Sequence, residues 1–178
     1  YAVANRDGGV GLCPFCRTPT PDSHEEIVEQ IKKRIEVNDV EAIRNLASCY
    51  SDGSRGFPQN HAKALELFLR AGELGHSDAY CDVGYAYETG RGVERDKKKA
   101  KHYYELAAIG GNIGARFNLG RKEHDAALNY GMARSEYTVS LKKTHTKKAL
   151  LHYIIAAGGG YAESLTVIKQ FYSTGYAT

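Results

Sequence analysis

The sequence predicts an all-α fold, a solenoid of stacked, antiparallel helix pairs. Apolar and small residues recur at helical spacing along most of the chain, and glycines separate the periodic segments. The whole pattern repeats after about 36 residues. One helix pair cannot bury both of its faces, so stacked copies are needed to form a continuous core.

Residues 76–111 contain the clearest helix pair. Ser77 or Asp78 is expected to cap the first helix, and Gly90 is expected to end it. Asp96 is expected to cap the second helix. Small residues on the inward stripes would let the two backbones approach to the short end of the usual ~8 to 10 Å range; these are Gly84, Ala100, Ala107 and Ala108.

The pattern recurs on both sides of this pair. Residues 39–75 form a copy that precedes it, and residues 112–160 form a copy that follows it. The second helix of the third copy lies 49 rather than 36 residues after its counterpart, which places an insertion at about 121–146. This insertion either extends the first helix or adds a short extra one. Residues 161–178 begin a fourth copy with its first helix alone.

Residues 22–38 predict a connecting and capping helix. Ser23 and Glu26 form a capping box at its start. Three isoleucines then make an apolar stripe: Ile27, Ile31 and Ile35. By register this helix corresponds to the second helix of a pair, so it is expected to close the N-terminal end of the solenoid.

The recurring motif is specific enough to suggest a family. It reads A-x-x-x-[LV]-G, then Y-x-x-G-x-G-V-x-x-D-x-x-K-A, then Y-Y-x-x-A-A-x-x-G. This motif resembles the Sel-one-like repeat, a relative of the tetratricopeptide repeat. The resemblance is nearly complete in residues 76–111, good in 39–75 and interrupted by the insertion in 112–160. It implies a right-handed solenoid of about three repeats that binds a protein or peptide ligand.

Residues 1–21 contain a motif of a different kind, CPFCR at 13–17. The thiolates of Cys13 and Cys16 are half of the tetrahedral ligand set that Zn²⁺ requires. The form C-P-x-C-R, with a Pro-rich exit, resembles the last ligand pair of a RING finger, the zinc module of many ubiquitin ligases. The resemblance implies further zinc ligands from upstream of residue 1. It also implies that two residues contact a ubiquitin-conjugating enzyme: Pro14 and Arg17.

Other interpretations of Cys13 and Cys16 stay open. They could belong to a MYND-type or zinc-ribbon-like unit, or form a redox or structural thiol pair. His24 is a conceivable third ligand, but it directly precedes a helix whose capping it would disturb.

Composition and charge narrow the function. The net charge of +3 is too small to imply nucleic acid, and no apolar run approaches the ~18 residues of a membrane span. No signal-peptide pattern opens the sequence, so an intracellular protein, cytoplasmic or nuclear, is expected. No Ser-His-Asp, HExxH or P-loop pattern occurs, so no active site is predicted in the solenoid.

Lysines cluster around the start of two second helices. Cations there oppose the helix dipole, so local stability does not explain them. They form either a solvated rim or an edge that attracts an acidic partner. The clusters are Lys97, Lys98, Lys99 and Lys101 in one copy, and Lys142, Lys143, Lys147 and Lys148 in the next.

One polar slot recurs in the first helix of each copy, at Asn45, Asp82 and Asn118. Side chains of this kind can hydrogen-bond the backbone of an extended peptide, so they are predicted to line a binding groove. The alternative, that they connect one repeat to the next, stays open. Further groove contacts are expected from Tyr80, Tyr85 and Arg116.

Taken together, the motifs predict a protein–protein interaction scaffold. The more specific hypothesis is the substrate- or partner-binding part of a RING-type ubiquitin ligase, with zinc as its cofactor. The alternative is a non-enzymatic adaptor in which the zinc module is structural.

Overall fold

The computed structural model describes residues 24–129 and 136–173, and these residues form helices and connections without a strand. The predicted zinc-finger segment, residues 1–21, lies outside them. The described helices, in chain order, are α1 (His24–Glu36), α2 (Val40–Asp52), α3 (His61–Glu73), α4 (Ser77–Thr89), α5 (Lys97–Ile109), α6 (Ile113–Asn129), α7 (Glu136–Gly158) and α8 (Ala162–Ser173).

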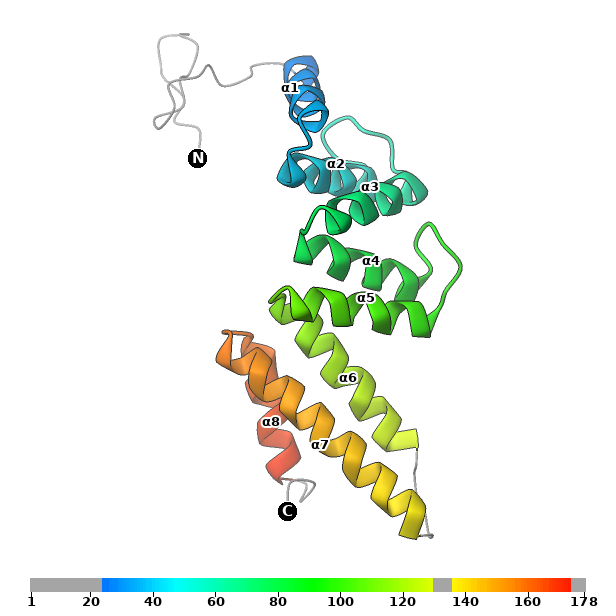
Figure 1. Cartoon of the computed structure of the whole chain (residues 1–178), viewed down its shortest axis with the longest axis vertical. Helices are drawn as coiled ribbons and strands as arrows, with labels where there is room; N and C mark the ends of the chain where they lie inside the picture. The colour runs from blue at the N-terminus through cyan, green and yellow to red at the C-terminus, as the bar shows by residue number, and fades with distance from the viewer. Residues whose placement is uncertain (1–23, 130–135, 174–178) are drawn as a thin grey trace.

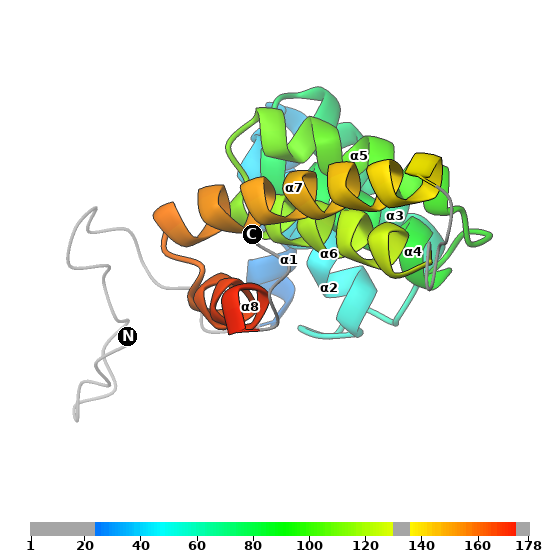
Figure 2. The same cartoon turned by 90° about the horizontal axis from the view of Figure 1, so that it is seen from below.

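The helices stack in chain order along the long axis of the molecule (Figure 1). α2 pairs with α3, α4 with α5, and α6 with α7, and each pair packs on the next. α6 and α7 run obliquely to the helices before them, and α8 folds back beside α7 (Figures 1 and 2). The predicted all-α solenoid is therefore confirmed.

Helix boundaries follow from side-chain caps and glycines. The carboxylate of Asp96 accepts hydrogen bonds from the amides of Lys98 and Lys99 at 2.8 and 3.0 Å, as its place before α5 predicted. Gly90 ends α4 with a left-handed φ of 79°. The first helix of this pair differs from the prediction, because its N-cap residue is His76 rather than Ser77 or Asp78.

A physical reason for that difference lies in the next repeat. The Asp78 carboxylate accepts a hydrogen bond from the Asn112 side-chain amide at 2.5 Å, and it is therefore used between repeats. His76 makes no side-chain cap bond. Its ring nitrogen lies 2.9 Å from Glu41 of α2 instead.

In two of the helix pairs, a glycine of the first helix faces a tyrosine ring of the second helix. Gly84 of α4 faces Tyr104 of α5, and Gly120 of α6 faces Tyr153 of α7. A Cβ placed at Gly84 or Gly120 would come within 2.7 or 2.8 Å of the facing ring. Both tyrosines are buried, so these contacts lie at the centre of their pairs.

The insertion lengthens both helices of the third pair. α6 has 17 residues and α7 has 23, whereas α2 to α5 have 13 each. His145 of α7 occupies the slot that Asp96 holds in the repeat before, and residues 136–144 contain neither Gly nor Pro. Because no helix-breaking residue occurs in this segment, α7 is helical over residues that correspond to a loop in the repeat before.

A side chain larger than hydrogen at Gly84 should destabilise the packing of α4 against α5. Gly84→Ala is expected to cost about 1 to 3 kcal/mol in the free energy of unfolding, because the new methyl group overlaps the Tyr104 ring. Urea denaturation followed by circular dichroism measures the change.

Gly114 provides the matched control for this substitution. It lies in α6, and a methyl group added there would have only the Asn112 side-chain oxygen nearby, at 3.4 Å. Gly114→Ala should leave stability unchanged or raise it by up to about 1 kcal/mol through helix propensity. An equal loss in both variants would contradict the assigned contact.

Candidate binding groove

Three adjoining hollows run along the first helices of the repeats, and we call them together the groove. The first hollow has a volume of about 230 Å³ and lies among α2, α3 and α4. The second, about 570 Å³, lies between α4 and α6. The third, about 400 Å³, is bordered by α4, the connection to α5, α5, α6 and His145 of α7. Tyr85 joins the first two hollows; Glu88, Arg95 and Arg121 join the last two.

Three of the predicted residues border this groove. Asp82 lines the first hollow, Asn118 lines the second, and Tyr85 lines both. The Tyr85 side chain is exposed, with 46% of its surface accessible. Asn118 makes no side-chain hydrogen bond within the part of the chain that the structure describes, so its amide is available to a ligand.

Asp82 has a second role that the sequence left as an alternative. Its carboxylate lies 3.2 Å from the guanidinium of Arg44 in the preceding repeat. Burial raises the pKa of Asp82, and Arg44 offsets part of this effect. This member of the predicted polar slot therefore connects α2 to α4.

The other predicted contacts lie elsewhere. Asn45 borders none of the three hollows. The Tyr80 ring faces Gly72 of α3 and lies 6.0 Å from the Tyr103 ring, so it packs between helix pairs.

Arg116 also has a local role. Its guanidinium donates to the carbonyl of Ala108 at 3.1 Å, in the last turn of α5. The same carbonyl also accepts from the Gly111 amide at 3.2 Å, so Arg116 adds a second, cationic donor at the C-terminal end of α5.

A set of equivalent positions one turn further along the first helices borders the groove in three successive repeats, and we call this set the ladder. Ser48, Tyr85 and Arg121 occupy one slot in successive repeats, and each borders the groove. They follow each other at the same spacing as the predicted polar slot. That spacing was a usable signal, but it did not indicate which of several slots faces the hollows.

Glu88 connects three helices at the point where the second and third hollows meet. Tyr104 of α5 donates to one carboxylate oxygen at 2.7 Å, and Lys122 of α6 contacts the other at 3.0 Å. Burial would raise the pKa of Glu88, but these hydrogen bonds outweigh it and the pKa lies below its ordinary value. Both oxygens of Glu88 are thus used within the fold.

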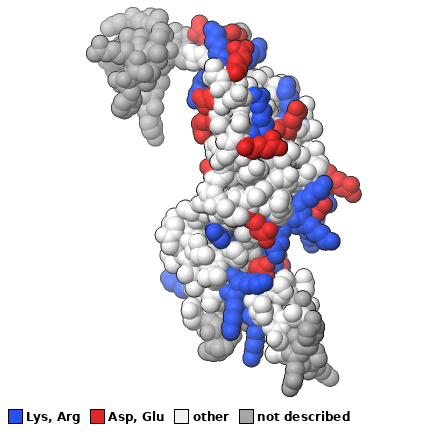
Figure 3. All heavy atoms as spheres, viewed as in Figure 1, with Lys and Arg blue, Asp and Glu red and all other residues white. Residues whose placement is uncertain are grey.

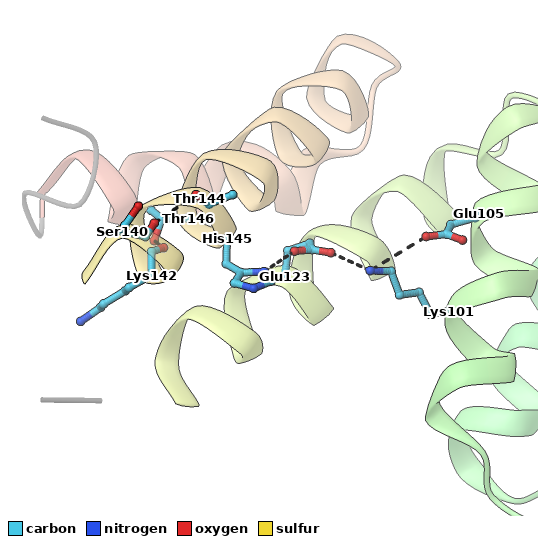
Figure 4. Close-up of polar contacts among 8 residues, drawn as sticks. All are labelled: Lys101, Glu105, Glu123, Ser140, Lys142, Thr144, His145 and Thr146. Atoms are coloured by element: carbon cyan, nitrogen blue, oxygen red, sulfur yellow. Dashed lines mark hydrogen bonds and ion pairs between the residues drawn. The ribbon is translucent and has the colours of Figure 1, made fainter. Parts of the chain in front are cut away.

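Glu123 forms a similar junction on the other side of the third hollow. Figure 4 shows its carboxylate between Lys101 of α5, at 2.9 Å, and the His145 ring of α7, at 2.7 Å. Lys101 also lies 4.0 Å from Glu105. The Glu123 side chain is only 7% exposed. Burial would raise the pKa of Glu123, but the bonds from His145 and Lys101 hold it below its ordinary value.

The surface around the third hollow is basic. On the face shown in Figure 3, Lys and Arg side chains gather over the connection from α4 to α5 and again along α7. Five cations line the third hollow, against three carboxylates. The cations are Arg95, Lys97, Lys101, Arg121 and Lys122.

The Cys81 thiol of α4 is not arranged as a nucleophile. Burial, with Asp82 and Asp78 nearby, raises the pKa of the Cys81 thiol to about 12, so the nucleophilic thiolate is disfavoured. No group of three His, Cys, Asp or Glu side chains in residues 24–129 and 136–173 could hold a metal ion. No described helix is long and apolar enough to cross a membrane.

Stacked helix pairs with an open groove along one set of helices define an α-solenoid repeat protein. Residues 40–76 and 77–112 each match the Sel1 repeat, so the chain contains two Sel1 repeats. It is similar to the crystal structure of a Sel1 repeat protein from Oxalobacter formigenes, with a TM-score of 0.70 and 28% sequence identity. That match covers 86% of this chain and 57% of the other.

Two sequence relatives each match less than half of this chain. The ERAD-associated E3 ubiquitin-protein ligase component HRD3A of Arabidopsis thaliana is 38% identical over 87 residues, which cover 47% of this chain and 13% of that protein. Chitin synthase regulatory factor 2 of Schizosaccharomyces pombe is 35% identical over 79 residues, covering 44% of this chain and 15% of that protein. The chain thus corresponds to a small part of both relatives.

The predicted zinc-finger residues Cys13, Pro14, Cys16 and Arg17 lie outside the described part of the chain. The family match and the structural match bear on the repeats alone. The RING interpretation therefore stays a prediction.

The Glu123 junction should give stability a defined pH dependence. A depressed carboxyl pKa contributes stability that is present above the unfolded value, about 4.5, and is lost as pH falls through the folded value. Glu123→Gln should lower the free energy of unfolding at pH 7 by about 1 to 3 kcal/mol. It should also flatten the fall in stability below about pH 4.5, as measured by urea denaturation across that range.

Glu105→Gln is the matched control because Glu105 contacts the same lysine from a half-exposed position. Its effect at pH 7 should stay within about 0.5 kcal/mol. If the two variants behave alike, the buried junction does not carry the stability assigned to it.

Proposed function

We propose that this chain is a protein–protein interaction scaffold whose groove holds an extended segment of a partner protein. The observation that carries the proposal is the ladder of Ser48, Tyr85 and Arg121, which presents unlike side chains along three joined hollows. Such a series suits a segment whose successive residues differ. The names of the two relatives, a ligase component and a regulatory factor, support a binding role.

We further propose that the chain is the substrate- or partner-binding part of a RING-type ubiquitin ligase. The C-P-x-C-R motif supports this, because Cys13 and Cys16 would supply two of four zinc ligands, the others coming from outside this sequence. Pro14 and Arg17 would contact the conjugating enzyme. The likeness to HRD3A, named as a component of a ubiquitin ligase, adds support. A cytoplasmic or nuclear location accords with this role.

A second candidate function is a non-enzymatic adaptor with a structural zinc module. The observation that favours it is the likeness to chitin synthase regulatory factor 2, whose name describes regulation of a synthase. In this role the groove would act in the same way, and the zinc module would only stabilise or dock. Ubiquitin discharge from a charged conjugating enzyme, measured with the zinc module complete, separates the two candidates.

The groove can be tested without knowing the partner. A displayed peptide library selected on this chain should yield binders whose affinity falls by about 1 to 3 kcal/mol in Tyr85→Ala and in Asn118→Ala, since both side chains border the groove. The melting temperature should change little, because Tyr85 is half exposed and Asn118 makes no side-chain hydrogen bond among the described residues. Fluorescence anisotropy measures the affinity.

Asn45→Ala is the matched control, because Asn45 holds the slot of Asn118 in an earlier repeat and borders none of the three hollows. It should leave peptide affinity within about twofold of the parent. Failure to select any binder, or binders that respond equally to all three substitutions, would contradict the proposed groove.

Zinc content tests the assignment of the first segment. Two thiolates do not complete a tetrahedral site, so residues 1–178 alone should retain no tightly bound zinc after dialysis. Elemental analysis gives the stoichiometry. One zinc per monomer would show that further ligands lie within this sequence, with His24 the first to substitute.

A further inference from the structure

We propose that the partner segment is acidic, and that Arg95, Lys97 and Arg121 bind its carboxylates in the second and third hollows. This inference rests on the proposed function, and it adds the chemistry and the orientation of the bound segment. It depends on which charges in these hollows are already used within the fold and which are not.

Two carboxylates of these hollows, the half-buried Glu88 and the buried Glu123, have both oxygens paired. Glu88 is held by Tyr104 and Lys122, one on each oxygen. Glu123 is held in the same way by Lys101 and His145. Lys101 and Lys122, two of the five cations of the third hollow, are thus paired within the fold, and every oxygen of the two carboxylates accepts a hydrogen bond.

The remaining cations form no ion pair with a carboxylate within residues 24–129 and 136–173, although the charge of Arg121 also acts on Glu88. Arg95 donates its Nε hydrogen to the backbone carbonyl of Glu88 at 2.7 Å, which holds the guanidinium at the border of both hollows. Arg121 also borders both hollows, and Lys97 borders the third. Asp125 is the carboxylate that remains to balance these three cations.

Two guanidinium groups that border the same hollows favour a carboxylate ligand. Arginine presents a planar fork of donors that matches a carboxylate in a bidentate way. Holding Arg95 through its Nε also lowers the entropy lost when its terminal nitrogens bind. This end of the groove is therefore arranged for glutamate or aspartate side chains.

The opposite end of the groove carries less positive charge. The first hollow is lined by Asp52, by Arg91 and by Asp82, whose carboxylate is already paired with Arg44. Arg91 lies 5.3 Å from the centroid of the Tyr85 ring, so part of its charge faces that ring. A bound segment is thus oriented with an apolar residue at Tyr85 and its acidic residues toward α6.

The test uses three fluorescein-labelled probes: a peptide of leucine followed by six glutamates, the same peptide with glutamines, and a single-stranded DNA decamer. The glutamate peptide should bind with a Kd below about 1 mM, more tightly than both other probes and more weakly as salt increases. The double variant Arg95→Gln/Arg121→Gln should weaken its binding about tenfold or more.

A charge-matched control is available on α1. Lys32 and Lys33 are exposed, and α1 lies at the opposite end of the stack from α6, which borders the second and third hollows (Figure 1). Lys32→Gln/Lys33→Gln removes the same net charge and should leave affinity within about twofold. Circular dichroism and thermal melts of both double variants confirm that each one folds.

Several outcomes would overturn the inference: no binding of the glutamate peptide, equal binding of the glutamine peptide, tighter binding of DNA, or equal losses in the two double variants. The selected library peptides separate this result from the wider proposal. If they depend on Tyr85 and Asn118 but neither carry acidic residues nor respond to the arginine variant, the groove stands and the acidic partner is wrong. If they are indifferent to Tyr85 and Asn118, the groove itself fails.

Discussion

The close contact between a glycine and a tyrosine ring is the constraint on which the rest of this solenoid depends. Gly84 and Gly120 let the rings of Tyr104 and Tyr153 reach the backbone of the facing helix, where a single methyl group would overlap them. Each ring fills the centre of its pair and is almost fully buried. Because the two helices of a pair then have little freedom to slide, their outward faces keep a fixed register, and the next pair can stack on them.

The same tyrosine contact links the core to the groove. The Tyr104 ring is buried, and its hydroxyl donates a hydrogen bond to one carboxylate oxygen of Glu88. Lys122 of the next repeat donates to the other oxygen. Hydrogen bonds to both oxygens of this half-buried carboxylate are costly to break, so Glu88 fixes α4, α5 and α6 relative to one another. Glu123 does the same for α5, α6 and α7. These junctions hold the borders of the groove, and they also leave nearby cations without partners, which suits the binding of an acidic ligand.

The described part of the third-repeat insertion contributes to this site. Glu123 of α6 and His145 of α7 both border the third hollow. In the repeat before, the slot of His145 is held by Asp96, which caps α5. A capping residue has thus been replaced by one that pairs across helices, and the helix that would have started there continues through it.

The all-α solenoid, the helix pairs and most of their boundaries could be predicted from the sequence, because periodicity, caps and glycines act over a few residues. The positions of Tyr85, Asp82 and Asn118 on the first helices that line the groove were predictable for the same reason. Three features depend on tertiary packing and could not be predicted: Tyr80 packs between helix pairs, Arg116 binds the end of α5, and one hollow is bordered by Arg95, Lys97 and Arg121. Local spacing sets which face of a helix a residue occupies, whereas the neighbour that covers this face comes from a segment tens of residues away.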